Sequence, residues 1–435
     1  MFRKILPLFL ILFAAPAWAV ELTAGPMVGH VTDQTARVWM QFPIAGEVTV
    51  NAFDVERNQP VSGVRIGLSG PTPFVCDIPV NNLQPNRSYR IEVKFDGDPV
   101  KLPGPELVLR TAPSPGEEAV FSVAFGSGIQ IAPLPPATMS APQTAPAATP
   151  HRLPIFRAIM ELKPRAFIFL GNTGMLPAKL EDFPPTHRAA YRYLADFHSL
   201  IRREPDLQSL LRATPCYALF NDRDFGPVGS DAGYVFAQES LVAFQRFWPN
   251  PDWGTPENPG CYATFTFGDV DFYLLDTRTF RQEKALLGEA QLAWLEKNLK
   301  ASTGAFKIIG APCTLWGDDP QHPDADSWSR YPAEQQSFLR WLGDNHIPGV
   351  IALAGNQASA SGLTKFEPEA GLKIKYPLFT LGCSTLAAAG PAAANTFGTL
   401  DFAGLREHRF VTLRLHDEAG KTRLEQVLLA GQLRN

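Results

Sequence analysis

Five short polar or glycine-rich segments follow apolar runs in this sequence, and they carry most of the side chains that could do chemistry. Each apolar run has the length and the Val, Ile and Phe content of a buried strand. In sheets flanked by helices, ligands bind beyond the carboxyl ends of the strands, where several loops meet. We therefore expect one site, built from GSG (126–128), GNTGM (171–175), NDRDFG (221–226), DTRTFR (276–281) and GNQAS (355–359).

The third segment raises a question of charge. Asn221, Asp222, Arg223 and Asp224 are consecutive, so two carboxylates of the kind that bind metal ions flank an arginine. Arginine carries a permanent positive charge, which disfavours a divalent cation close by. Two interpretations remain open for this cluster: an ion pair that fixes the loop, or a site for an anion.

The elements that would position these segments alternate between strand and helix from residue 120 onward. This alternation predicts an α/β sheet covered by helices on both faces. The expected strands are VFSVAFGS, RAFIFLGNTG, CYALFNDRD, VDFYLLDTR, FKIIGAP and GVIALAGNQ, followed by the terminal strands RFVTLRLH and RLEQVLLAG. The expected helical segments are LPIFRAIMELKP, THRAAYRYLADFHSLIRREPDLQSLLRA, GEAQLAWLEKNLKAS and PAEQQSFLRWLGDN.

The chain before residue 113 has a different pattern, which predicts an all-β domain over residues 20–112. Its apolar runs are short, rich in β-branched and aromatic residues, and separated by turn sequences such as NNLQPN and FDGDP. Trp39 on an early strand and Tyr89 at the start of a late strand are typical of an immunoglobulin-like or fibronectin-like sandwich, in which such a tyrosine braces a corner. Residues 113–119 form the expected linker to a second domain, 120–435.

Two further segments are set apart by composition. Residues 1–19 combine a basic start (MFRK), an apolar stretch and a small-residue cleavage site ending at Ala19. This combination predicts a signal peptide, and hence a periplasmic or secreted protein without an integral membrane segment after cleavage. Residues 131–150 are rich in Pro and Ala, which predicts a poorly ordered insertion. A tether without a role is the favoured interpretation, and a segment that covers the site is the alternative.

Charge and cysteine content exclude several classes of protein. The net charge is −4 without a Lys/Arg-rich run, which argues against nucleic acid or an anionic membrane as a partner. The five cysteines are widely spaced without a CxxC pair, which excludes a zinc ribbon and a dense disulfide framework. Buried free cysteines are the favoured interpretation, with one structural disulfide as the alternative.

In their order along the chain, the five segments resemble those of the alkaline phosphatase D family of metallophosphoesterases. The phrases that carry the resemblance are LLDTRTFR (274–281), LGEAQLAWLEKNL (287–299), KIIGAP (307–312) and the run from Trp328 to Gln336. The resemblance extends across nearly the whole mature chain. It implies a metallophosphoesterase-like α/β/β/α sandwich preceded by the all-β immunoglobulin/fibronectin-like domain.

The resemblance also implies a centre of iron and calcium, or of two divalent metals, yet most ligand positions are substituted. The family's Cys in the first loop is Gly128, while the Asp and the following Tyr of the second loop are Asn172 and Met175. In the third loop the first Asp and the His are Asn221 and Arg223, with Asp222 and Asp224 retained. In the fifth loop the Asp and the His are Asn356 and Ala358.

These substitutions predict a protein without a metal cofactor and without catalytic residues; Asp222 and Asp224 are the ligands if any metal binds. We expect Arg223 to neutralise the two aspartates and the cleft to bind a small phosphate-like anion. The expected anion-binding residues are Arg223, Arg278, Arg281, Asn172 and Asn356. For Arg278 and Arg281, packing of the loop is the favoured alternative to contact with a ligand.

Other side chains receive a structural interpretation. Ser127 lacks the spacing of a nucleophile elbow and has no evident His–acid partners. Surface positions rather than replacement ligands are expected for His151, His187, His198, His322, His346, His408 and His416.

Three functions remain open. The predicted function is a pseudo-phosphatase that binds an anionic ligand or a protein partner. The first alternative is an active phosphomonoesterase or phosphodiesterase with atypical metal ligands. The second is a structural or interaction protein with an empty cleft.

Overall fold

The computed structural model describes residues 20–70, 72–130, 153–317, 326–356, 361–388 and 395–434. The predicted signal peptide, the predicted insertion at 131–150, His151, His322 and Ala358 lie outside these residues. Within them, no helix is long and apolar enough to cross a membrane.

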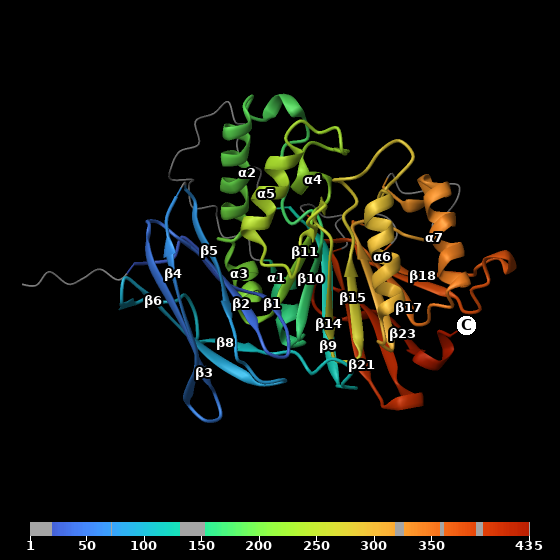
Figure 1. The fold of residues 1–435 in the computed structure, drawn as a ribbon, viewed down its shortest axis with the longest axis horizontal. Coiled ribbons are helices and arrows are strands. Elements are labelled where there is room, and N and C mark those ends of the chain that lie inside the picture. The colour runs from blue at the N-terminus through green and yellow to red at the C-terminus, as the bar shows by residue number, and fades with distance from the viewer. Residues whose placement is uncertain are drawn as a thin grey trace, which may run out of the picture.

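The N-terminal strands form two sheets, drawn in blue to cyan in Figure 1. Tyr89 is buried, and its hydroxyl accepts a hydrogen bond from the Gln84 N–H at 2.7 Å, so it braces the corner as predicted. Trp39 is also fully buried. The predicted sandwich is confirmed. One sheet contains β1 (Ala24–Val31), β2 (Ala36–Phe42) and β5 (Phe74–Val80), and the other contains β4 (Gln59–Leu68), β3 (Gly46–Asp54), β6 (Ser88–Phe95), β7 (Asp98–Pro99) and β8 (Leu107–Arg110).

Two larger sheets follow, and each mixes parallel and antiparallel pairs. The seven-stranded sheet contains β11 (Cys216–Leu219), β10 (Ala166–Leu170), β9 (Phe121–Ile129), β21 (Thr396–Ala403), β22 (Phe410–Asp417) and β23 (Thr422–Leu429), with β20 (Thr385–Ala387) paired to β9. The six-stranded sheet contains β14 (Ala263–Phe267), β15 (Val270–Leu274), β16 (Phe306–Ala311), β17 (Val350–Ala354), β19 (Leu378–Gly382) and β18 (Gly362–Phe366). A two-stranded ribbon is formed by β12 (Gly254–Thr255) and β13 (Asn258–Pro259).

The two large sheets pack against each other through aromatic side chains. The ring of Phe402 on β21 lies 5.6 Å from that of Phe306 and 6.4 Å from that of Phe272, both on the other sheet. The prediction of a single sheet covered by helices on both faces is therefore wrong. The domain has two large sheets, and each buries one apolar face against the other. The α/β/β/α arrangement implied by the resemblance is confirmed.

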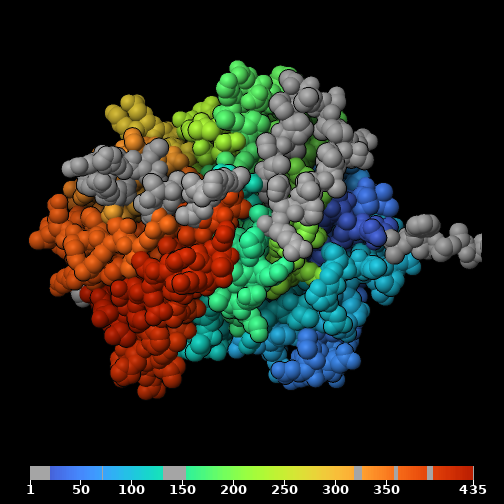
Figure 2. All heavy atoms as spheres, turned by 180° about the vertical axis from the view of Figure 1, so that it is seen from behind, coloured from blue at the N-terminus to red at the C-terminus, as the bar shows by residue number. Residues whose placement is uncertain are grey.

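Helices cover the outer faces of these sheets. Figure 1 shows the green helices on the side of the sandwich, and the gold α6 and orange α7 toward the opposite end. Seen from behind, the blue N-terminal and red C-terminal residues likewise occupy opposite sides of the molecule (Figure 2). The helices are α1 (Pro154–Glu161), α2 (His187–Ile201), α3 (Pro205–Ala213), the single turn α4 (Asp222–Phe225), α5 (Ala237–Phe247), α6 (Glu289–Ala301) and α7 (Pro332–Asp344).

A buried arginine joins the sandwich to the helical layer. The guanidinium of Arg202 lies 5.1 Å from the ring centre of Trp39 on β2, and it also faces the rings of Phe247 and Trp248. Burial lowers the pKa of Arg202 to about 9. The Trp39 indole donates to the Arg246 carbonyl at 2.7 Å. Cation–π contacts and this hydrogen bond therefore hold the two parts of the chain together.

The prediction for the cysteines is confirmed, whereas the prediction for two of the histidines is wrong. All five cysteines lie buried and none forms a disulfide, as favoured. His198 and His416, however, are buried rather than on the surface. His198 stacks on Phe247 with ring centres 5.5 Å apart. It lies four residues after the buried Leu194, and therefore on the apolar face of α2.

Candidate functional site

The five predicted segments contact one another at one end of the two large sheets. The Gly128 N–H donates to the Gly171 carbonyl at 3.1 Å, which joins the first segment to the second. The Asn356 N–H donates to the Ser127 hydroxyl at 2.6 Å, which joins the fifth segment to the first. We call these contacting segments the loop cluster. The expectation that they meet is confirmed by these bonds.

The first segment is a strand rather than a turn. Residues 126–128 lie inside β9, where Ser127 pairs with Thr385 of β20. Gly128 has φ +69°, a backbone conformation that L side chains rarely adopt, and a Cβ atom there would lie 2.7 Å from the Thr385 side chain. Strand pairing therefore continues past the expected turn, and position 128 suits glycine.

Asp224 holds the second and third segments together from inside the cluster. It is fully buried, and its Oδ2 accepts the N–H groups of Asn172 at 2.5 Å and Asn221 at 2.9 Å. Its Oδ1 accepts the N–H and the hydroxyl of Thr173 at 2.8 and 2.6 Å. Burial raises the pKa of Asp224 to about 7, while these four hydrogen bonds oppose the rise. The Asp224 carboxylate thus accepts four hydrogen bonds from other groups of the protein.

Asp222 is also engaged by the main chain. It is half-buried at the start of the single-turn helix α4. Its Oδ1 accepts the Arg223 N–H at 2.9 Å, and its Oδ2 accepts the Gly229 N–H at 3.2 Å. A carboxylate in this position stabilises the first turn of a helix by accepting its unpaired amide groups.

Arg223 does not pair with either aspartate. Its Nε donates to the Leu176 carbonyl at 2.5 Å, and its main-chain N–H donates to Asn172 Oδ1 at 3.1 Å. Neither Asp222 nor Asp224 forms an ion pair with it in the described part of the chain. The expected neutralisation of the two aspartates by Arg223 is therefore wrong. The aspartates accept main-chain amides instead, some from their own turn and some from Asn172 and Thr173 on the preceding segment.

Asn172 and Asn356 face each other across the cluster. Asn172 Nδ2 lies 3.5 Å from Asn356 Oδ1, at the long limit of a hydrogen bond. Both residues have left-handed backbones, with φ of +52° and +57°, which asparagine tolerates better than most residues. Asn172 is buried and Asn356 is half-buried. The two amides thus form a neutral polar wall where the resemblance implies carboxylates.

Arg278 is a fully buried part of the fourth segment. Its Nε and Nη2 donate to Asn221 Oδ1 at 2.8 and 2.5 Å, and its guanidinium pairs with Asp326. Arg281 also pairs with Asp326, at 2.6 Å, and donates to the Tyr331 hydroxyl at 2.7 Å. Burial raises the pKa of Asp326, but the charges and hydrogen bonds of the two arginines outweigh it and hold this pKa below its ordinary value. These bonds fit the packing alternative for both arginines.

Asn221 leaves one donor of the cluster without an acceptor. It is fully buried, and its Oδ1 is taken by Arg278, but its Nδ2 has no hydrogen-bond partner among the described residues. A buried donor without an acceptor is costly, which favours an acceptor group or a water molecule beside it. Sequence reasoning treated Asn221 only as a substituted metal-ligand position. No local sequence pattern distinguishes such a position from a buried amide that offers a hydrogen-bond donor.

Sequence reasoning also missed three residues that shape the cluster. Thr173 binds Asp224, the Leu176 carbonyl anchors Arg223, and Asp326 pairs with two arginines. Thr173 could have been found as the hydroxyl inside the GNTG segment. Asp326 lies 48 residues after Arg278, without a motif that connects them. Met175 is half-buried, and nothing in the structure explains why Met occupies this position.

The residues present do not fit the two-metal centre that the resemblance implies. Such a centre needs several carboxylate, imidazole or thiolate ligands directed at two cations. Here both oxygens of Asp222 and of Asp224 are bound by main-chain or hydroxyl donors. Across the residues that the structure describes, no three His, Cys, Asp or Glu side chains form a group that could hold a metal ion.

Comparisons with known proteins agree on ancestry. Residues 234–371 match the family described as PhoD-like phosphatase, and residues 19–110 match a domain of unknown function, DUF7800. The chain is 23% identical over 195 residues to "Alkaline phosphatase D" of Bacillus subtilis (strain 168). That match covers 37% of this chain and 33% of the relative, so it spans about a third of the relative's length.

Two solved structures share the fold. A structure of PhoD matches with a TM-score of 0.73 and 16% identity, covering 95% of this chain and 90% of that chain. Purple acid phosphatase PPD1 from yellow lupin (Lupinus luteus) seeds matches with a TM-score of 0.62 and 12% identity, covering 93% and 74%. At these identities the likeness establishes the arrangement of strands and helices alone.

Proposed function

The chain is PhoD-like in sequence and fold, and we propose that it is a pseudo-phosphatase whose loop cluster binds a small phosphate-like anion without metal ions. Phosphatase relatives supply the ancestry. The site residues of this chain argue against phosphatase chemistry, because an arginine and amides occupy positions at which metals would need anionic or imidazole ligands.

The balance of donors and acceptors in the cluster carries this proposal. Each oxygen of Asp224 accepts two hydrogen bonds, which fills its acceptor sites, and each oxygen of Asp222 accepts one. Among the residues that the structure describes, donors are left over: Asn221 Nδ2 has no acceptor, Asn172 Nδ2 has only a 3.5 Å contact, and Arg223 donates from its guanidinium only through Nε. A site with spare amide and guanidinium donors favours an anion.

The first prediction concerns metal content and turnover. We expect the purified, desalted protein to retain less than one equivalent of iron, calcium, zinc or manganese, and to hydrolyse p-nitrophenyl phosphate no faster than buffer. The reason is the loss of ligands together with Arg223, which stays charged and cannot protonate a leaving group. Elemental analysis and a phosphatase assay on one preparation measure both quantities.

The contrary outcome has a clear form. Two retained equivalents of metal, with a rate that disappears in Asp222→Asn, would establish the active phosphatase in place of the pseudo-phosphatase. This second function is favoured by the match of residues 234–371 to phosphatases. A rate that persists unchanged in Asp222→Asn would point to a contaminating enzyme.

The second prediction concerns anion binding. At constant ionic strength, 10 mM phosphate is expected to raise the melting temperature by a few degrees relative to chloride. For a dissociation constant of about 1 mM, binding to the native state adds about 1.4 kcal/mol to the free energy of unfolding. Arg223→Ala should abolish the rise, and Asn356→Asp should do the same by placing a carboxylate in the amide wall. Thermal scans of each variant provide the measurement.

Arg157→Ala is the matched control, because Arg157 is an exposed arginine on α1, outside the cluster. It removes one positive charge and should leave the phosphate effect intact. Equal stabilisation of wild type, Arg223→Ala and Asn356→Asp would show that phosphate acts elsewhere. A melting temperature that phosphate leaves unchanged in wild type would favour the interaction protein with an empty cleft.

A further inference from the structure

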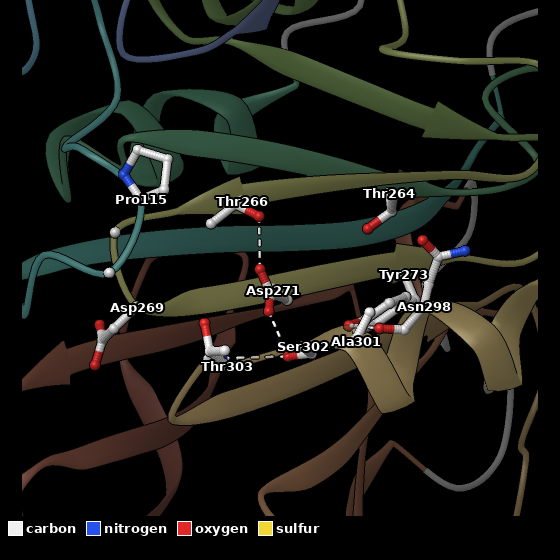
Figure 3. Close-up of a pocket in the computed structure, with 13 residues that line it drawn as sticks. Pro115, Thr264, Thr266, Asp269, Asp271, Tyr273, Asn298, Ala301, Ser302 and Thr303 are labelled. Atoms are coloured by element: carbon white, nitrogen blue, oxygen red, sulfur yellow. Dashed lines mark hydrogen bonds between the residues drawn. The ribbon is translucent and has the colours of Figure 1, made fainter.

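A polar cavity lies at the opposite end of strand β15 from the loop cluster. Its volume is ≈ 360 Å³, within the range of sites for small molecules. Asp271, near the start of β15, lines it, whereas Asp276 of the loop cluster follows the end of that strand. Figure 3 shows side chains from β14, β15 and the segment after α6 turned toward this space. We call it the β15 pocket.

The linker also contributes to the β15 pocket. Pro115 and Gly116, which connect the sandwich to the large sheets, form part of its lining. The Gly116 N–H donates to the Gly268 carbonyl at 2.8 Å, so the linker is fixed to the β14–β15 turn. The pocket wall is therefore held by main-chain bonds rather than by a free loop.

Asp271 is the centre of the polar lining. Its Oδ1 accepts the hydroxyl of Thr266, its cross-strand partner, at 2.5 Å, and its Oδ2 accepts the hydroxyl of Ser302 at 2.5 Å. Figure 3 shows both hydrogen bonds. A carboxylate oxygen has two acceptor sites, so each oxygen keeps one for a further donor.

The other lining groups donate their protons to the protein as well. The Thr264 hydroxyl donates to the Phe272 carbonyl at 2.9 Å, and the Tyr273 hydroxyl donates to the Asn298 carbonyl at 3.3 Å. Asn298 Nδ2 donates to the Trp294 carbonyl at 2.8 Å. These bonds use the hydroxyl protons of Thr264 and Tyr273 and one of the two amide protons of Asn298, so the two hydroxyls offer oxygen lone pairs to a ligand. The β15 pocket is thus rich in acceptors.

Charges of both signs surround the pocket: Asp269 and Asp271 are negative and Arg409 and Lys307 are positive. Burial lowers the pKa of Lys307 to about 8, and the charge of Asp271 opposes this lowering. Asp269 at its edge is matched by Arg409, which binds both of its oxygens at 2.6 and 2.8 Å. Lys307 is a buried cation nearby, but its ammonium donates to the Gly304 carbonyl, and no ion pair joins it to Asp271 in the described part of the chain. Asp271 therefore remains the carboxylate that a ligand can approach.

We propose that the β15 pocket binds a small organic cation of the primary-ammonium class. An ammonium group carries three donors and one positive charge, which match the acceptors of the wall and the carboxylate of Asp271. Carbonyl groups at the end of α6 favour a cation in addition, because the negative end of the helix dipole lies there. The volume limits the ligand to a small molecule. This site is independent of the anion proposed for the loop cluster.

Three probes separate charge from hydrogen bonding. Ethanolammonium chloride has both, ethylene glycol has donors without charge, and tetramethylammonium chloride has charge without N–H donors. At constant ionic strength, ethanolammonium is expected to stabilise the protein against heating, and to show saturation transfer by NMR, at millimolar concentration. The other two probes should do neither.

Variants assign the effect to the pocket. Asp271→Asn removes the charge and keeps the shape, and it should weaken ethanolammonium binding about tenfold or more. Thr264→Val removes one lining acceptor without touching Asp271, and it serves where Asp271→Asn does not fold. Asp98→Asn, at an exposed position on β7, is the matched control and should bind as wild type.

Two results would overturn the proposal. Binding of ethylene glycol or tetramethylammonium as strong as that of ethanolammonium would exclude recognition of an ammonium group. Equal binding by wild type and by the Asp271→Asn and Thr264→Val variants would place the ligand outside the β15 pocket, as would the absence of binding to wild type.

Discussion

Replacing Arg278 with methionine is expected to lower the free energy of unfolding by about 3–5 kcal/mol, the usual cost of removing one partner of a buried ion pair. Arg278 is fully buried and serves both Asn221 and Asp326. Without it, Asn221 Oδ1 loses its two guanidinium donors and Asp326 loses one of its arginine partners. Denaturant unfolding of wild type and variant at the same pH measures the loss.

Arg223→Met is the informative comparison for this result. Arg223 belongs to the same loop cluster, but its side chain makes one hydrogen bond, to the Leu176 carbonyl, and no ion pair among the described residues. We expect a loss of only about 1 kcal/mol. The phosphate effect should behave in the opposite way, persisting in Arg278→Met and disappearing in Arg223→Met. A stable Arg278→Met protein without the phosphate effect would make Arg278 an anion ligand instead of a positioning residue.

The pattern of residues was sufficient to predict the strands and helices that carry the cluster. Strands β10, β11, β15 and β17 each lie within an apolar run that ends before a polar segment, because buried strands leave little room for polar residues, whereas β9 continues through its polar segment. The number of sheets was not predictable in the same way. Antiparallel pairs such as β21 with β9 depend on contacts between distant segments.

The partners of the charged side chains inside the loop cluster were harder to predict from the sequence. An Asp beside an Arg has the same sequence pattern whether it pairs with that Arg, binds a metal or accepts main-chain amides. Asp224 takes the last role because the turns after β10 and β11 direct four donors at it. Arg278 is similar, since its partner Asp326 is remote in the chain. Burial and partner identity, rather than residue type, decide these roles.

Asp224 is also expected to make the protein less stable as pH rises toward neutrality. Burial raises its pKa from 3.8 to about 7 in the folded state, so the folded protein holds a proton that the unfolded chain has released between these values. The free energy of unfolding must then fall with increasing pH across this window. The total fall is on the order of 4 kcal/mol if the full difference in pKa applies.

Asp224→Asn cannot titrate, so its stability should change less with pH than that of wild type. At low pH the variant is expected to be less stable by about 1–3 kcal/mol, because one amide hydrogen faces a main-chain N–H that needs an acceptor. The difference should shrink as pH rises toward 7, because the unfolded wild-type chain releases the Asp224 proton in this window while the folded protein keeps it. Urea unfolding from pH 4.5 to 8 on both proteins measures the two slopes.

Asp222→Asn serves as the control for this comparison, because Asp222 lies in the same turn but is half-buried. It should keep the wild-type slope. If wild type and Asp224→Asn instead have parallel pH dependences, Asp224 remains charged throughout the range. The four hydrogen bonds to its oxygens would then outweigh burial, and the cluster would contain a permanent negative charge. That charge would oppose an anion, so this result bears directly on the pseudo-phosphatase proposal.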